Sequence, residues 1–476
     1  MFSGYVFWFI ISKFATAATV GTSSAVISMV TIFINIATIG IPIGVERFLG
    51  KSFSEKKLGN ARLFVEASTV LVSFGTLACC IAILIFRNLI QNVFKIDPSL
   101  MVVAILLICS SCIYNLFRSV IISSLKTKSL PLIMIISTGA KIVLSIVLVL
   151  MGMGAFGITL GYALFSILGS ILFIIVVIMI FKGSKNNADL KLKQSFKNIL
   201  EASMTNWIPA LIATLGSQLG TIVVFASNGA SQAGVYFISY SIVTAIAAVA
   251  SVLFTIAFPA LSAMDDGRKT FVWRIIKMSA IISIPFSASA FFYSKEIMQL
   301  FGQSYADGSL LLQIMVLATL PGQIASGVST LTYSYGKYRQ ALSIGITGNV
   351  ARIILFFILV PMYGSSGAAL SYTLSTITSL IMSMYISRKI GLHIFWKIIV
   401  LTHIVPFVLA FVLSYFQVNF IIGTFITLVS SYLLLLRLHI ITRSDIQDSV
   451  GVLPGSIANS TLNLLNKIGK KLDSSY

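Results

Sequence analysis

The chain has 476 residues, of which 57% are hydrophobic and only 10% are charged. A soluble protein carries about a quarter charged residues, so this composition excludes a soluble globular protein and indicates a surface that mostly faces lipid or other helices. The formal net charge is +20. In a soluble protein that charge would indicate nucleic-acid binding, but here it indicates topogenic charge beside anionic lipid headgroups, with no nucleic-acid partner.

Apolar runs follow one another along almost the whole chain. A run of about 20 apolar residues spans the hydrocarbon core of a bilayer as a helix. The pattern predicts fourteen such spans: 2–18, 24–45, 63–86, 100–124, 130–151, 157–181, 204–226, 234–262, 275–294, 308–332, 341–361, 366–386, 398–416 and 420–436.

Lysines and arginines gather in every second gap between the predicted spans. The gaps 46–62 and 182–197 are strongly basic, whereas the gaps of the opposite set hold only Arg87, Lys95 and Lys295. Positive charge stays on the cytoplasmic side of a membrane. We therefore expect a multi-pass protein of the cell membrane with the N-terminus and the C-terminus in the cytoplasm.

The sequence contains an internal repeat. Residues 140–162 (AKIVLSIVLVLMGMGAFGITLGY) resemble residues 351–372 (ARIILFFILVPMYGSSGAALSY), so that Lys141 matches Arg352 and, after a slip of one residue, Tyr162 matches Tyr372. A weaker similarity pairs the stretch that ends at Pro42 with the stretch that ends at Pro259. Two halves that run in the same sense are typical of parallel repeats, which enclose a midplane cavity and rock against each other.

These patterns predict an all-α polytopic membrane protein with about fourteen transmembrane helices in two pseudo-symmetric six-helix bundles plus two C-terminal helices. Residues 456–472 place apolar residues near helical spacing, with lysines between them. That pattern favours an amphipathic helix on the inner leaflet, with a partner-binding tail as the alternative. The expected parts are an N-terminal bundle (1–181), a cytoplasmic linker (182–203), a C-terminal bundle (204–386), two extra helices (387–436) and a cytoplasmic tail (437–476).

Apart from Lys277, which lies at the start of the span 275–294 and is counted with the basic gap before it, four cations fall inside predicted spans: Lys13, Arg118, Lys141 and Arg352. A charge at the bilayer centre costs about 3 kcal/mol on insertion scales, so such a side chain normally faces a wet cavity or a partner. Two explanations are open. The cations pair with Glu66, Glu201 or backbone carbonyls, or they line a lumen that receives an anionic group such as a phosphate.

The stretch IPIGVERFLGK (41–51) ends a predicted span at its inner mouth. Glu46 and Arg47 there fit either a helix end with topogenic charge or an inner gate whose ion pairs break as the cavity opens. Pro42 and Pro259 are candidates for the kinks of such a gate, because proline removes a backbone hydrogen bond.

Other chemistry is weakly supported by the sequence. Gly50-Lys51-Ser52 lacks the upstream glycine of a phosphate-binding loop, since Val45 stands in its place, so no nucleotide site is expected. Cys79, Cys80, Cys109 and Cys112 favour apolar packing over a metal site, and His403 favours a structural role over a proton relay. No catalytic residues, metal or cofactor are predicted.

At IPIGVERFLGK, VLFTIAFPALSAM (252–264) and LVPMYGSSGAALSY (359–372), the chain resembles the polysaccharide-synthesis branch of the multidrug/oligosaccharidyl-lipid/polysaccharide exporter superfamily, the flippases of O-antigen or lipid-linked oligosaccharides. The resemblance runs along most of residues 4–436. It implies two six-helix bundles arranged as a V, two further helices and an Arg- and Lys-rich lumen. Relatives usually have more chain before the region of Gly4, which implies a short first span here.

The expected function is a flippase that moves a polyprenyl-type phosphate- or pyrophosphate-linked glycan to the outer leaflet by alternating access. Its partners would be this cargo, membrane lipids and glycan polymerase or glycosyltransferase machinery. Polar residues inside the spans fit either sugar hydroxyls or helix–helix hydrogen bonds: Asn35, Asn115, Asn206, Gln218 and Asn349. The alternatives are a multidrug or cation antiporter of the same superfamily and, from another class, a membrane glycan polymerase or ligase.

Overall fold

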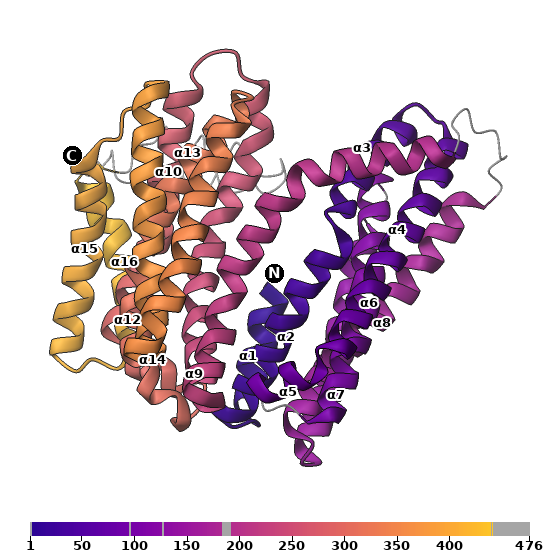
Figure 1. Ribbon diagram of the computed structural model, residues 1–476. Helices are drawn as coiled ribbons and strands as arrows, with labels where there is room; N and C mark the ends of the chain where they lie inside the picture. The colour runs from indigo at the N-terminus through magenta and orange to yellow at the C-terminus, as the bar shows by residue number, and fades with distance from the viewer. Residues whose placement is uncertain (1, 95–96, 126–127, 183–191, 439, 441–476) are drawn as a thin grey trace. The chain divides into compact units, whose positions relative to one another are not determined.

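The computed structural model of the protein describes residues 2–94, 97–125, 128–182, 192–438 and 440. In these residues the regular structure is helical (Figure 1). The helices are α1 (Phe2–Ser12), α2 (Ala17–Thr38), α3 (Ile41–Ser54), α4 (Leu58–Ile85), α5 (Arg87–Phe94), α6 (Pro98–Ser123), α7 (Ser129–Leu150), α8 (Gly154–Phe181), α9 (Leu192–Ala263), α10 (Arg268–Phe292), α11 (Ser294–Gln299), the 3₁₀-helix η1 (Gln303–Gly308), α12 (Ser309–Val316), α13 (Thr319–Ser334), α14 (Tyr338–Ile390), α15 (Trp396–Tyr415) and α16 (Phe420–Arg437).

Ten of the described helices are long and apolar enough to cross a membrane, or eleven if the bent pair formed by 303–316 and α13 is one span. The expectation of an all-α, polytopic membrane fold is confirmed, but the count of fourteen spans is not. Two very long helices account for much of the difference. The 72-residue α9 and the 53-residue α14 each contain one residue with non-helical torsion angles, Gly229 and Gly364, where two helices meet.

The predicted spans 2–18 and 24–45 are wrong in their boundaries. The first helix ends at Ser12, and α2 begins at Ala17, where the hydroxyl of Thr16 accepts a hydrogen bond from the Thr19 amide. The second span ends at Thr38, because Ile39 and Gly40 adopt the left-handed conformation. An unbroken apolar run therefore hides two short interruptions of the helix.

The described chain divides into two compact units. The N-terminal unit comprises residues 3–237 and 356–365, and the C-terminal unit comprises residues 238–355 with the described part of 366–476. The division falls within α9 and α14. The helix α9 begins at Leu192, inside the stretch 182–203 that was expected to be a linker, and the tail beyond 440 lies outside the described residues.

In the N-terminal unit, α6 packs against α2, α3, α4 and α8, and α7 packs against α8 (Figure 1). Small residues allow close approach of these helices, as is usual where lipid supplies no hydrophobic driving force. A side chain added at Gly75 would overlap the Ala37 carbonyl of α2, and one at Gly161 would overlap the Ser145 hydroxyl of α7.

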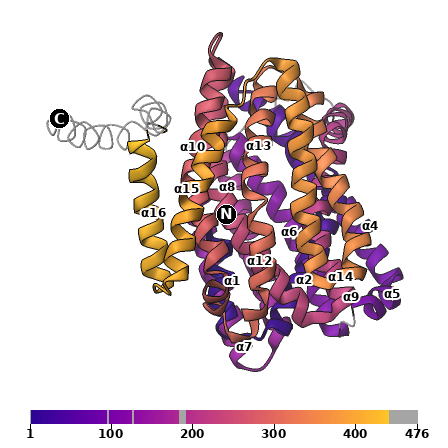
Figure 2. The ribbon, with the colours of Figure 1, turned by 90° about the vertical axis from the view of Figure 1, so that its left-hand side faces the viewer.

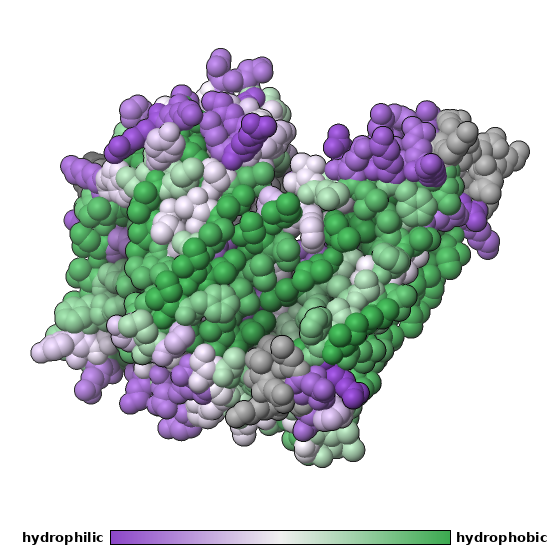
Figure 3. Space-filling view, viewed as in Figure 1, coloured by the Kyte–Doolittle hydropathy of each residue, from purple (hydrophilic) through white to green (hydrophobic). Residues whose placement is uncertain are grey.

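In the C-terminal unit, α10 is the central helix and packs against α12, α13, α15 and α16 (Figure 2). Its buried apolar residues include Trp273 and Ile276, which belong to a core cluster with Phe254, Ile324 and Val328. In each unit, polar side chains gather at the ends of the helices and apolar side chains cover their length (Figure 3). This distribution is the one a bilayer requires.

Candidate functional site

Lys141 lies in α7 with only 5% of its surface exposed. Its ammonium nitrogen is 4.3 Å from the ring centre of Phe7, 4.2 Å from that of Tyr162 and 5.2 Å from that of Phe165. We call these three rings the aromatic cage. All three distances are within the range of about 6 Å in which a cation is attracted by the face of an aromatic ring.

No carboxylate or hydrogen-bond acceptor holds the Lys141 ammonium in the described part of the chain. The two serines one helical turn away, Ser137 and Ser145, are fully buried, and their hydroxyls lack hydrogen-bond partners among the described residues. An ammonium group carries three N–H donors. The cage therefore satisfies the charge of Lys141 in part and leaves its hydrogen bonds unmade.

Helix packing in the N-terminal unit brings the cage together. The close approach of α7 and α8 at Gly161 places Tyr162 beside Lys141. Phe7 comes from α1 and packs edge-to-face against Tyr162, with ring centres 5.1 Å apart. The third ring, Phe165, also contacts Tyr114 of α6 at 5.1 Å.

Arg352 lies in the first part of α14, in the C-terminal unit. Its Nε donates a hydrogen bond to the Ser375 hydroxyl at 2.8 Å, and its Nη2 donates to the Thr376 hydroxyl at 3.3 Å. The guanidinium carbon lies 4.5 Å from the ring centre of Tyr372. Because a guanidinium has five N–H donors, three of them have no acceptor in the part of the chain that the structure describes.

The two cations therefore have equivalent surroundings in one respect. The repeat matches Lys141 with Arg352 and Tyr162 with Tyr372, and in the structure each cation lies over the tyrosine of its own repeat. They differ in the rest of their contacts: Lys141 is enclosed by rings, whereas Arg352 is fixed by two hydroxyls.

The carboxylates that were alternative partners for these cations are engaged elsewhere. Glu66 accepts a hydrogen bond from Arg62 at 2.9 Å, and Glu201 lies 3.7 Å from Lys197. Glu66 is 49% exposed and Glu201 is 65% exposed. The explanation that Glu66 and Glu201 neutralise Lys141 and Arg352 is therefore wrong.

Arg118 lies in α6, partly buried, one helical turn after Tyr114. Because Tyr114 contacts Phe165, the aromatic residues link Arg118 to the cage around Lys141. The N-terminal unit thus brings two of the predicted site residues into one neighbourhood.

Lys13 is not inside a helix, contrary to expectation. It follows the last residue of α1, is exposed, and lies 5.5 Å from the ring centre of Phe9. The structure does not bring Lys13 into contact with the cage or with Arg118.

The predicted gate residues lie on α3 and α9. Glu46 is exposed and accepts a hydrogen bond from the buried Ser119 of α6 at 3.0 Å, next to Arg118. Arg47 is exposed and lies 5.8 Å from the Phe48 ring centre. Neither forms an ion pair within the described residues, so the ion pairs expected of a gate are absent there.

The two prolines differ in position. Pro42 does not kink a continuous helix but stands in the first turn of α3, where a proline is well tolerated because the first amides of a helix are unpaired in any case. The bend before it comes from the left-handed Ile39 and Gly40. Pro259 lies inside α9, four residues before its last residue, Ala263.

The C-terminal end of α2 is held by hydrogen bonds from and to α9. The indole of Trp207 donates to the Asn35 carbonyl at 3.0 Å, one of the carbonyls left unpaired at the end of α2, and the Asn35 amide donates to the Thr214 hydroxyl. Asn349 donates to the Gly345 carbonyl of its own helix. Both residues were candidates for sugar binding, and both make hydrogen bonds within the protein.

The cysteines lie where α4 and α6 meet. The sulfur atoms of Cys80 and Cys109 are 3.5 Å apart, and all four cysteines are free thiols. Among the described residues, no three His, Cys, Asp or Glu side chains are placed to hold a metal ion. His403 stacks on Phe407, with ring centres 6.0 Å apart.

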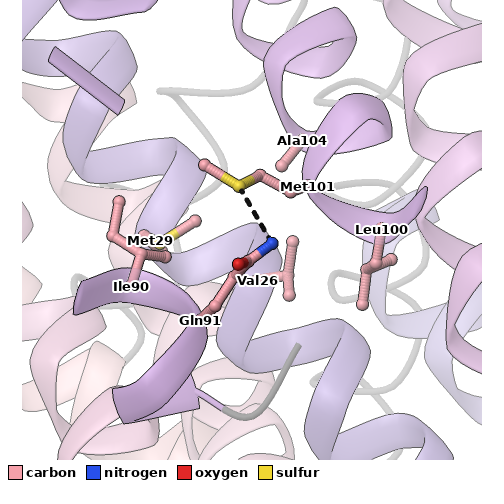
Figure 4. Close-up of a pocket in the computed structure, with 7 residues that line it drawn as sticks. All are labelled: Val26, Met29, Ile90, Gln91, Leu100, Met101 and Ala104. Carbon is pink, nitrogen blue, oxygen red and sulfur yellow. Dashed lines mark hydrogen bonds between the residues drawn. The ribbon is translucent and has the colours of Figure 1, made fainter. Parts of the chain in front are cut away.

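A small hollow lies apart from these residues, between α2, α5 and α6. It has an empty volume of about 220 Å³, which includes open solvent, and is lined by Val26, Met29, Ile90, Gln91, Leu100, Met101 and Ala104 (Figure 4). The Gln91 amide contacts the sulfur of Met101 at 3.9 Å. Its lining is apolar apart from Gln91 and contains no cation, so it does not extend the candidate site.

The aromatic residues of the cage were not predicted as site residues. Tyr162 carried a signal, because it ends the repeated segment and has Tyr372 as its counterpart. Phe7 and Phe165 carried none, since an aromatic residue in an apolar span is as readily lipid-facing as it is buried.

Comparison with known proteins agrees with the resemblance seen in the sequence. The model of the polysaccharide biosynthesis protein family matches residues 25–310. An uncharacterized membrane protein of Methanocaldococcus jannaschii is 25% identical over 310 residues, which cover 62% of this chain and 74% of that protein.

Among solved structures, the fold is similar to the lipid II flippase MurJ in an inward closed conformation, with a TM-score of 0.63 and 17% identity over 90% of this chain and 97% of that one. It is also similar to an inward-facing multidrug resistance transporter of the MATE family, with a TM-score of 0.64 and 14% identity over 82% and 94% of the two chains. At these identities the similarity concerns the fold alone. The family match shows that this multi-pass membrane protein belongs to the polysaccharide biosynthesis protein family, and its fold is similar to that of the MurJ and MATE structures.

Proposed function

We propose that the protein is a flippase for a lipid-linked oligosaccharide, and that it moves the glycan on its polyprenyl-type phosphate or pyrophosphate from the inner to the outer leaflet. It works by alternating access, without covalent chemistry or a cofactor, in the plasma membrane with both termini in the cytoplasm. Lys141, Arg118 and Arg352 hold the phosphate groups, and the lipid tail stays in the bilayer.

The observation that carries this proposal is that Lys141 and Arg352 lack anionic partners. Each lies in an apolar helix, each occupies the same position of the repeat, and no carboxylate compensates either charge within the described residues. A cation in such a place is expensive and marks a functional site by default, with an anionic ligand as one of the partners that would stabilise it. Phosphate is the anion that best matches a guanidinium fork and an ammonium point charge.

The two halves of the repeat, 1–181 and 204–386, are the moving parts in this mechanism. An interior-negative membrane potential favours the outward passage of an anion by about 2.3 kcal/mol per charge per 100 mV. Cations that travelled with the cargo would cancel this advantage. The binding cations therefore stay at nearly constant depth while access to them changes sides.

A multidrug or cation antiporter is the second candidate, because the MATE transporter has the same fold. An antiporter of cationic drugs uses carboxylates within the membrane to exchange them for protons or sodium ions. Glu66 and Glu201 are the acidic residues considered for that role, and both are largely exposed and paired with a neighbouring cation of their own helix. These contacts favour the flippase.

The test is translocation of a fluorescent lipid-linked oligosaccharide pyrophosphate in proteoliposomes. The double variant Lys141→Ala/Arg352→Ala should lose translocation while it still inserts and purifies as a monodisperse protein. The matched control, Arg87→Ala/Lys295→Ala, removes the same charge from exposed positions and should translocate normally. Normal translocation by the Lys141→Ala/Arg352→Ala variant would refute the assignment of these cations.

A further inference from the structure

The aromatic cage holds Lys141 by attraction to three ring faces, and within the described residues its ammonium donates no hydrogen bond. The side chain is nonetheless almost fully buried. A ligand that approaches this ammonium must therefore replace ring contacts. In exchange, the ligand would form charge-assisted hydrogen bonds with the ammonium, which the rings cannot form.

Arg352 presents a different situation. Two of its N–H groups are used by Ser375 and Thr376, one ring lies against it, and its other three N–H groups have no partner among the described residues. The guanidinium is only partly buried. An anion can be accepted there without breaking a contact with several rings.

Phe7 is the ring best placed to move. It belongs to α1, an eleven-residue helix joined to α2 by the non-helical residues 13–16, whereas Tyr162 and Phe165 belong to the 28-residue α8, which is packed against both α6 and α7. Phe7 is nevertheless completely buried, between Lys141 and Trp8.

We propose that Phe7, Tyr162 and Phe165 compete with the phosphate-bearing ligand for the Lys141 ammonium, with Phe7 as the lid of the cage. The cage keeps Lys141 occupied in the empty protein, so that only a ligand with enough negative charge to displace the rings is bound. The Lys141 ammonium binds the anion only after Phe7 withdraws. This inference rests on the proposed function for the identity of the ligand, but its test needs only the anion.

The test is the binding of inorganic pyrophosphate to the purified full-length protein in detergent micelles, measured by equilibrium dialysis with radiolabelled pyrophosphate. Removal of one cation–ring contact changes an equilibrium by a factor of about 2 to 30. Phe7→Leu should therefore lower the Kd for pyrophosphate by about 2- to 30-fold. The control Phe14→Leu changes an exposed phenylalanine next to Lys13 and should leave the Kd unchanged.

Two further variants separate competition from a general loosening of the protein. Pentafluorophenylalanine at position 7 keeps the shape of the ring but reverses its quadrupole, so it should lower the Kd in the same direction as Phe7→Leu without a loss of packing. In the double variant Phe7→Leu/Lys141→Ala, the gain should vanish, because the ammonium for which ring and anion compete is gone.

An unchanged or higher Kd in folded Phe7→Leu and in the fluorinated protein would overturn the proposal, as would the absence of pyrophosphate binding in the parent and in both Phe7 variants. The outcome is separable from the proposed function. If the parent does not translocate a lipid-linked glycan but the Kd values change as expected, the flippase assignment is refuted and the competition between the rings and the anion for Lys141 is supported. If translocation is observed and the Kd values do not change, only the cage fails.

Discussion

The Lys141 ammonium lies 4.2 Å from the centre of the Tyr162 ring, and no carboxylate approaches it in the part of the chain that the structure describes. The same relationship recurs between Arg352 and Tyr372 at 4.5 Å. A cation over a tyrosine, placed at matching positions of two repeats, is a feature that both halves of the protein retain although their other contacts differ. Each of these two cations thus lies inside an apolar helix with no carboxylate partner among the described residues.

Close packing of α2 against α9 makes Gly21 intolerant of a side chain. A Cβ at Gly21 would overlap the Ala230 carbonyl, and one at Gly234 would overlap the Ala17 carbonyl. Because both partners are backbone, Gly21→Ala should lower the free energy of unfolding by about 1–3 kcal/mol, as overpacking does elsewhere. The measurement is thermal unfolding in detergent. Gly139→Ala, at a helical position with open space around it, is the control and should not destabilise the protein. Equal melting temperatures of the two variants would contradict the close packing of α2 against α9 at Gly21.

The contact between α4 and α6 can be tested through its cysteines. The Cys80 and Cys109 sulfurs are 3.5 Å apart, so mild oxidation with copper–phenanthroline should join them with a small movement of either side chain. Mass spectrometry of the digested protein should show a Cys80–Cys109 disulfide. Cys109→Ala should abolish this product, whereas Cys79→Ala should keep it. A product that links Cys79 to Cys112 instead would show a different register of the two helices.

Glu46 accepts its hydrogen bond from Ser119, beside Arg118. If α3 gates access from the cytoplasm, Glu46→Ala should slow translocation and leave the Kd for pyrophosphate unchanged, because the residue contacts α6 and not the cargo. The effect on stability should stay below about 3 kcal/mol, the upper end of the contribution of one hydrogen bond to a charged group. A higher Kd with an unchanged rate would make Glu46 part of the binding site rather than of a gate.

The cations of the candidate site could be proposed from the sequence because a charged residue stands out in an apolar span, and the repeat places two of them at matching positions. Lys141 and Arg352 were found in this way, and the structure gives both a tyrosine neighbour. The pairing with Glu66 was a wrong alternative for a local reason: Arg62 is four residues before Glu66 on the same helix and meets it directly. A nearer partner on the same helix takes precedence over a distant one.

The position of Phe7 and the end of α2 were not predicted from the sequence. The first depends on contacts between residues far apart in the chain, and the second on the backbone torsion angles of single residues. Phe7 reaches Lys141 only because α1 folds back beside α7 and α8, and no periodicity within residues 2–12 indicates it. The end of α2 depends on the left-handed conformation of Ile39, a β-branched residue that rarely adopts it. Hydropathy alone could not reveal either, since every residue involved is apolar or small.

The antiporter alternative makes a clear prediction for the acidic residues. Glu66→Gln and Glu201→Gln remove carboxylates that pair with Arg62 and Lys197 at largely exposed positions. Because exposed ion pairs of this kind contribute only about 0.2–1 kcal/mol, both variants should keep their fold and translocate the glycan at the parental rate. Loss of a proton- or sodium-driven efflux of cationic dyes in either variant would instead favour the antiporter.

A substitution at Arg352 can distinguish a residue that contributes only its positive charge from one whose guanidinium binds phosphate. Arg352→Lys keeps the positive charge but replaces a planar fork of five donors with a point charge of three, so at most one donor is left for an anion once Ser375 and Thr376 are bound, and bidentate binding is lost. We expect the Kd for pyrophosphate to rise about tenfold, equivalent to about 1.4 kcal/mol and close to the value of one charge-assisted hydrogen bond. Arg339→Lys, which makes the same exchange at an exposed position, should bind as the parent does. If Arg352→Lys binds equally well, the fork is not used, and the role of Arg352 reduces to its charge.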